Sequence, residues 1–121
     1  MLVIRPEQLE VFQRVANRDF EERLRRHLQR IWPETCLMLG AAEVDRRIAD
    51  GIDRAVERGL GSERAAAAFV DVSWAVGEHF YREAWARAIF ANRSLDAEAK
   101  AARLYAAADR HLRQARVQAA E

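Results

Sequence analysis

The chain has 121 residues, a length typical of one compact domain, and we expect a single domain over residues 1–121. Half of the residues are hydrophobic and 32% are charged, a composition that can bury a core and that excludes a disordered tail protein. Twenty Lys and Arg residues are balanced by nineteen Asp and Glu residues, and the formal net charge of +1 excludes the strongly basic surface of a polyanion-binding protein.

The cysteine content and the hydropathy pattern predict a cytoplasmic protein without a membrane partner. The single cysteine, Cys36, cannot form an internal disulfide. The sequence has neither the charged start and apolar run of an export signal nor the roughly 18 consecutive apolar residues of a membrane span. We therefore expect no targeting to a membrane.

The first residues predict an extended N-terminal strap. Residues 1–5 contain the short apolar run Leu2, Val3 and Ile4 and precede Pro6, which suits the first turn of a helix. The strap either packs across the helices of its own chain or pairs with another chain, because extended backbone has unpaired hydrogen-bonding groups.

Three helices follow the strap. Apolar residues recur every three or four positions over residues 6–31, which predicts a helix that ends before Pro33. A short helix over residues 33–39 ends at Gly40, and a third helix ends at Gly59.

The next helix is the predicted centre of the fold. Ser62 is a candidate N-cap, and residues 63–80 are apolar on almost every side, which a helix tolerates only when neighbours cover it. Gly77 inside this segment predicts a bend or a close helix crossing.

The remaining residues predict a short helical stretch up to Asn92 and a last helix capped by Ser94, with residues 118–121 as a frayed tail. The fold class is therefore all-α, a single-domain bundle of about five to six helices around the nearly all-apolar helix over about 63–80. The large aromatic residues are enough to fill one small core, and the residues expected there are Phe12, Phe20, Trp32, Phe69, Trp74, Phe80 and Trp85.

Residues capable of catalysis or metal binding are sparse. His79 and Glu83 share a helix face, and Glu78 is next to His79, but a metal site needs more converging ligands than these. Cys36 stands in an apolar stretch, which favours a buried, unreactive thiol. We expect no catalytic residue, no metal and no cofactor, and hence a protein that is not an enzyme.

Nucleic-acid binding is also disfavoured. Arg23, Arg25 and Arg26 alternate with acidic residues, which weakens the field that phosphate groups require. The turn over residues 57–62 could belong to a helix-turn-helix motif, but the helix after it is too apolar to read bases.

A series of apolar, Gly and Pro landmarks runs through nearly the whole chain. The landmarks are Phe20-Glu21-Glu22-Arg23-Leu24, His27-Leu28, Trp32-Pro33-Glu34, Cys36, Leu39-Gly40, Gly51-Ile52, Arg54-Ala55, Gly59-Leu60-Gly61-Ser62-Glu63, Phe69-Val70-Asp71, Gly77-Glu78-His79-Phe80, Trp85-Ala86-Arg87-Ala88-Ile89 and Leu104-Tyr105. Their order resembles a family of small all-helical bacterial proteins encoded beside type VI secretion effectors and spike-tip proteins, and the likeness includes no catalytic signature. Where the family usually has acidic residues directly after Phe80, this chain has Tyr81, Arg82 and Glu83.

This resemblance implies a cytoplasmic adaptor or chaperone-like accessory protein that holds a type VI secretion effector or spike component. An immunity-type protein that binds a toxin is the alternative, and a small helical DNA-binding regulator is a weaker one. The Ala-rich last helix leaves open whether it packs in its own chain or across a homodimer.

A protein without catalytic residues acts through its surface, and the surfaces we expect to bind a partner lie around the end of the central helix and in the strap. Arginine and aromatic side chains are enriched at the energetic centres of interfaces. The candidate partner-binding residues are Tyr81, Arg82, Trp85, Arg87, Leu2, Val3 and Ile4.

Overall fold

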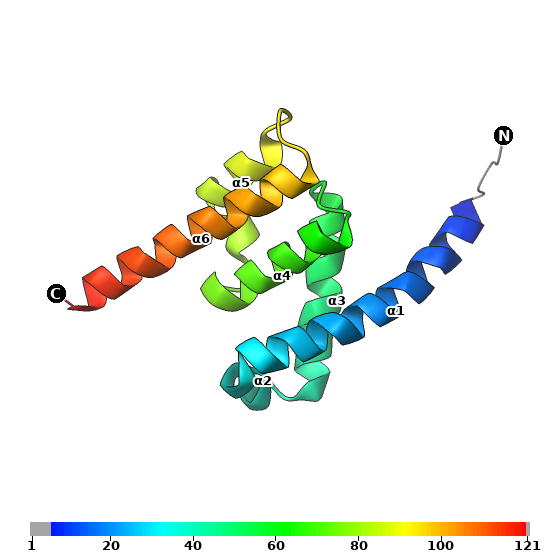
Figure 1. Cartoon of the computed structure of the whole chain (residues 1–121), viewed down its shortest axis with the longest axis horizontal. Helices are drawn as coiled ribbons and strands as arrows, with labels where there is room; N and C mark the ends of the chain where they lie inside the picture. Colours follow the sequence, from blue (N-terminus) through cyan, green and yellow to red (C-terminus); the bar gives the residue numbers. More distant parts are fainter. Residues whose placement is uncertain (1–5, 121) are drawn as a thin grey trace. The chain divides into compact units, whose positions relative to one another are not determined.

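A computed structural model describes the chain from Pro6 to Ala120, with side chains from Arg18 to Ala119 (Figure 1). The strap over residues 1–5, with Leu2, Val3 and Ile4, and the side chain of Phe12 lie outside the described residues. The described part is helical, with no strand, so the predicted all-α class is confirmed. Its elements are α1 (Pro6–Ile31), α2 (Pro33–Leu39), α3 (Ala41–Glu57), α4 (Glu63–Val76), the 3-10 helix η1 (Phe80–Arg82), α5 (Ala84–Ala91) and α6 (Ala97–Ala120).

Contacts along the chain group it into two compact units, residues 1–45 and residues 46–121, with the division inside α3. In the first unit, α1 buries Phe20, Leu24 and Leu28 at intervals of four residues, as the apolar periodicity predicts. Pro33 begins α2, and Gly40 ends it with a φ of 83°, a left-handed conformation that favours glycine.

The second unit is organised around α4. The Ser62 hydroxyl accepts a hydrogen bond from the Ala65 backbone N–H at 3.1 Å, which confirms the predicted N-cap. Helix α4 runs beside α6 and packs against it (Figure 1). On α3, Gly51 leaves room for the fully buried Val70 of α4, because a Cβ at this position would lie 2.9 Å from Val70 Cγ2.

The predicted end of the central helix is wrong. Helix α4 stops at Val76, not near Phe80, and Gly77 follows it with φ 134° and ψ 143°. This backbone conformation cannot continue a helix and is one that side-chain-bearing residues rarely adopt, so Gly77 terminates α4 where we expected a bend. Phe80 and Tyr81 therefore belong to the separate helix η1.

The aromatic core differs from the expected one. Phe20, Phe69 and Phe80 are buried, whereas Trp32, Trp74 and Trp85 are only half-buried, because an indole is too large to be covered completely in so small a unit.

The start of the last helix also differs from the prediction. Asp96, not Ser94, caps α6 by accepting a hydrogen bond from the Ala99 backbone N–H at 2.8 Å. Ser94 instead bonds to Asn92 within the preceding turn. At its other end, α6 continues to Ala120, and the fraying of residues 118–121 stays a prediction.

Candidate binding site

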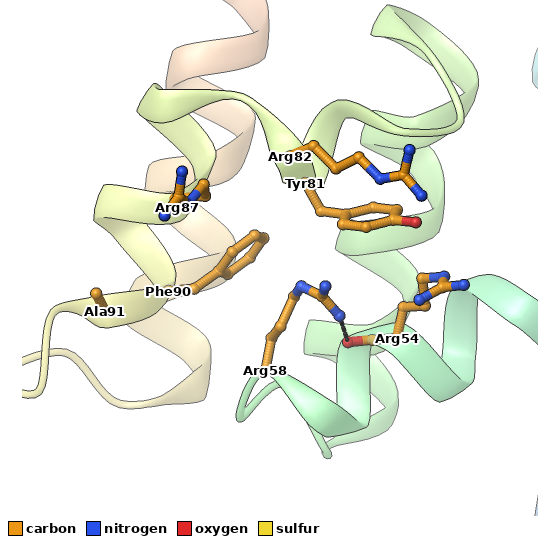
Figure 2. A pocket seen from close by; sticks show the side chains of 7 residues that line it. All are labelled: Arg54, Arg58, Tyr81, Arg82, Arg87, Phe90 and Ala91. Carbon is orange, nitrogen blue, oxygen red and sulfur yellow. Dashed lines mark hydrogen bonds between the residues drawn. The ribbon is translucent and has the colours of Figure 1, made fainter.

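An open pocket of about 690 Å³ lies in the second unit, between the end of α3, η1 and α5 (Figure 2). Among the described residues that line it, four are arginines, two are aromatic and none is acidic. They are Arg54, Arg58, Tyr81, Arg82, Arg87, Phe90 and Ala91, and we call this site the arginine pocket.

Local helix geometry directs these side chains into the pocket. Successive residues of a 3-10 helix diverge by about 120°, so Phe80 and Tyr81 of η1 point in different directions. Phe80 turns inward and packs on Phe69 with ring centres 4.8 Å apart, whereas Tyr81 lines the pocket. On α5, Arg87 and Phe90 are three residues apart and share one face of the helix.

Guanidinium groups surround the Tyr81 ring. The guanidinium carbon lies 4.4 Å from the ring centre for Arg58, 5.1 Å for Arg54 and 5.7 Å for Arg82. These distances suit cation–π attraction, in which the negative face of the ring stabilises a cation. Figure 2 shows the ring enclosed by the three arginines, with Phe90 on the α5 side.

Tyr81 is unusual for a residue that lines an open pocket. Its side chain is only 5% exposed, and its hydroxyl oxygen is buried without a hydrogen-bond partner among the described residues. Buried hydroxyl groups normally form a hydrogen bond. The packing around Tyr81 therefore does not by itself explain why its hydroxyl has no partner among the described residues.

Two of the four arginines are held by acidic neighbours. Arg54 donates a hydrogen bond to Asp50 at 3.2 Å, and this bond, followed by Coulombic attraction to the same carboxylate, raises the pKa of Arg54. Arg58 lies 3.4 Å from Glu57 and also donates to the Arg54 backbone oxygen at 3.0 Å, the bond dashed in Figure 2. Both side chains are thereby fixed beside Tyr81.

The other two arginines are exposed and have no acidic partner within the described part of the chain: Arg82 on η1 and Arg87 on α5. Four arginines and two paired carboxylates, Asp50 and Glu57, leave two positive charges uncompensated at the pocket. The arrangement suits an anionic group that arrives from outside.

The structure brings three of the candidate partner-binding residues together. Tyr81, Arg82 and Arg87 all line the arginine pocket. Trp85 lies outside it, stacked on Phe80 with ring centres 5.8 Å apart and tilted against His111 with ring centres 4.6 Å apart. Its indole N–H donates to Glu83. Leu2, Val3 and Ile4 fall outside the described residues.

Sequence reasoning missed Arg54, Arg58 and Phe90. Arg54 and Arg58 are four residues apart, a spacing that predicts side chains on the same side of a helical turn. Arg87 and Phe90 are three residues apart in the helical stretch predicted to end at Asn92, and their spacing predicts the same. The sequence shows these spacings, but it does not show that the two pairs of residues meet at the pocket of Tyr81.

No family model, curated protein or solved structure matches this chain.

The acidic residues near His79 have other partners. Glu78 pairs with Arg46 at 2.7 Å and with Arg47 at 3.6 Å, and Glu83 accepts the hydrogen bond of Trp85. Among the described residues, no group of three or more His, Cys, Asp and Glu side chains could hold a metal ion. Likewise, within Pro6–Ala120, no helix has both the length and the apolar character needed to span a membrane.

The first unit has a different kind of surface. Leu37 and Met38 of α2 are 85% and 86% exposed, although both are large and apolar. Cys36, between them and Thr35, is buried, as its apolar neighbourhood predicts. Exposed apolar groups of this kind are a feature of interaction proteins, but they carry no charge that would specify a partner.

Proposed function

We propose that this protein is a non-catalytic interaction module that binds another protein through the arginine pocket. The observation that carries the proposal is the combination of uncompensated Arg82 and Arg87 with the aromatic groups of Tyr81 and Phe90 in one open pocket. Arginine and tyrosine are among the residues most enriched at interface hot spots, because they combine large apolar area with directed hydrogen bonds.

The positive charge is local, which favours a protein partner over nucleic acid. Duplex DNA presents phosphates along its whole length and is bound by basic side chains spread over a face or stripe. Here the formal net charge is +1, and four of the chain's arginines line a single pocket. A membrane partner is not part of the proposal.

The landmark resemblance supplies the proposed biological setting. We propose a cytoplasmic adaptor or chaperone-like role, in which the partner is a type VI secretion effector or spike component. An immunity-type role would use the same pocket to inhibit a toxin. The fate of the partner separates the two, since an adaptor delivers its effector and an immunity protein neutralises it.

Co-expression with the product of a gene that neighbours the gene of this chain tests the proposal. The wild-type chain carries an affinity tag, and the amount of untagged partner that co-purifies is measured. The variant Arg82→Gln with Arg87→Gln should reduce co-purification about tenfold or more, because two charged hydrogen-bonding groups are lost from the interface. Arg103→Gln with Arg110→Gln is the matched control, since both arginines are exposed on α6 and do not line the pocket.

Three results would contradict the proposal or parts of it. Equal co-purification by the pocket variant and the control variant would show that the pocket is not the binding surface. Retention of duplex DNA at about 150 mM salt, lost in the pocket variant, would favour the DNA-binding regulator. Rescue of cells from a toxic partner, without secretion of that partner, would favour the immunity role.

A further inference from the structure

We infer that the arginine pocket binds an acidic peptide segment of the partner, with two carboxylates on Arg82 and Arg87 and an apolar side chain against Tyr81 and Phe90. This inference rests on the proposed function and names the chemistry of the segment that the pocket recognises.

The count of charges at the pocket sets the number of carboxylates. Arg54 and Arg58 already pair with Asp50 and Glu57, whereas Arg82 and Arg87 have no acidic partner in the described chain. A guanidinium group binds a carboxylate through two parallel N–H···O bonds, so each unpaired arginine accommodates one carboxylate. Two carboxylates therefore neutralise the pocket.

The Tyr81 hydroxyl provides an independent observation. It is a buried donor without an acceptor among the described residues, in a side chain that is 95% covered and lines the pocket. In Figure 2 it points toward the side of the pocket where the guanidinium groups of Arg54 and Arg82 lie. Arg82 is exposed, so its side chain can move aside and allow a carboxylate oxygen to accept the hydroxyl proton in a hydrogen bond.

The apolar part of the lining favours a peptide over duplex DNA. Phe90 and Ala91 form the α5 side of the pocket, next to Arg87. Phe90 is half-buried and contacts Phe69 and Phe80, which fixes its ring in place. A fixed aromatic face beside two arginines fits an apolar side chain flanked by carboxylates, a combination that duplex DNA with its stacked bases does not present. Single-stranded nucleic acid can stack a base on such a face, and the experiment below therefore includes it.

Fluorescence anisotropy with a synthetic probe tests the inference. The probe is a short fluorescein-labelled peptide with a run of glutamates beside one leucine, and its control has glutamine in place of every glutamate. The wild-type chain should bind the glutamate peptide at least about tenfold more tightly than the glutamine peptide, and raising the salt from about 50 to about 300 mM should weaken binding.

Variants of the intact chain locate the binding. Arg82→Gln with Arg87→Gln should lower the affinity for the glutamate peptide about tenfold or more, whereas Arg103→Gln with Arg110→Gln should leave it unchanged. Tyr81→Phe should lower the affinity severalfold, because it removes only the hydroxyl donor. Unchanged circular dichroism and thermal unfolding show that each variant is folded.

The outcomes separate this inference from the proposed function. Equal affinity for the two peptides, or tighter binding of single-stranded DNA of the same charge, overturns the acidic-segment inference. If co-purification of the co-expressed partner is nevertheless reduced in the Arg82→Gln, Arg87→Gln variant, the proposed function stands, and the pocket binds a segment that is not acidic. If the partner co-purifies equally with the pocket variant, the proposed function itself fails, whatever the peptides do.

Discussion

Phe80 and Tyr81, two consecutive residues of η1, have contrasting surroundings in the second unit. Phe80 belongs to an aromatic cluster with Phe69, Phe90 and Trp85, in which rings pack on rings. Tyr81 is almost as deeply buried, at 5% exposure against 2%, yet arginines surround its ring. Burial therefore does not by itself indicate an apolar environment.

The difference has a physical reason. An arginine can lay its flat guanidinium group and aliphatic stem over an aromatic ring while the charge stays in contact with water. The buried rings of Phe69 and Phe80 exclude water and stabilise the fold, whereas the arginine pocket covers the Tyr81 ring and still presents charge to a ligand. Stability and binding should accordingly respond to substitution in different regions.

Phe69→Ala should cause the largest loss of stability. Phe69 is 1% exposed, and its ring contacts those of Phe80, Tyr81 and Phe90, so the substitution leaves a large cavity. We expect the free energy of unfolding to fall by about 3–5 kcal/mol, measured by urea denaturation. Val56→Ala, at a side chain that is 56% exposed, should cost less than about 0.5 kcal/mol. Similar losses in the two variants would show that the aromatic cluster is not the core.

Gly51→Ala should have the next largest effect. The new methyl group would lie 2.9 Å from Val70 Cγ2, and Val70 is fully buried and stiff about its χ1 bond. Overpacking costs about 1–3 kcal/mol and outweighs the gain of up to about 1 kcal/mol in helix propensity. The control is Gly61→Ala, where nothing lies within 4 Å of the added atom. A stabilised Gly51→Ala variant would mean that α3 and α4 are not closely packed at this point.

Tyr105→Phe should have a smaller and pH-dependent effect. Tyr105 on α6 donates a hydrogen bond to Asp71 at 2.8 Å, and burial, followed by this bond, raises the pKa of the Tyr105 hydroxyl. The residue is half-exposed, so its removal should cost only about 0.5–1 kcal/mol at pH 7.

The sign of the pH dependence follows from the raised pKa. The folded state holds the Tyr105 proton more tightly than the unfolded state, whose tyrosines titrate near about pH 10. The stabilisation is therefore complete below about pH 10 and is lost as the pH rises further. Urea denaturation at about pH 9 and about pH 11 should show the gap between wild type and Tyr105→Phe shrinking. A constant gap would exclude this hydroxyl as the titrating group.

Tyr81→Phe should have the smallest effect on stability and the opposite sign to Tyr105→Phe. The ring and its cation–π contacts remain, and a buried hydroxyl without an acceptor in the described chain is removed. We expect the free energy of unfolding to stay constant or to rise by up to about 1 kcal/mol. A loss of more than about 1 kcal/mol would reveal that the hydroxyl has an acceptor in the folded protein.

Local signals in the sequence located much of the fold. The interval of Phe20, Leu24 and Leu28 marked the buried side of α1, Gly40 marked the end of α2, and Ser62 marked the start of α4. Each of these features depends on neighbours within one helical turn, which a sequence displays directly.

Sequence features that are compatible with two different structures were predicted less well. Gly77 was compatible with both a bend and a terminus, and the apolar residues beyond it favoured the longer helix. Three of the predicted partner-binding residues, Tyr81, Arg82 and Arg87, lie together in the arginine pocket, and their role in binding stays a prediction. Arg54 and Arg58, which come from a distant part of the chain, were not among the predicted residues. Sequence spacing did not indicate which helices meet.

The sequence alone determined the all-α class, most helix boundaries and the modest net charge, because composition, periodicity and capping act over a few residues. Only the tertiary structure decided that four arginines from three segments line one pocket, that three of them surround a buried tyrosine, and that two of the four lack an acidic partner among the described residues. The reason is physical: a charge is compensated or left unpaired according to what folding brings within a few ångströms of it, and separation along the chain does not fix that distance.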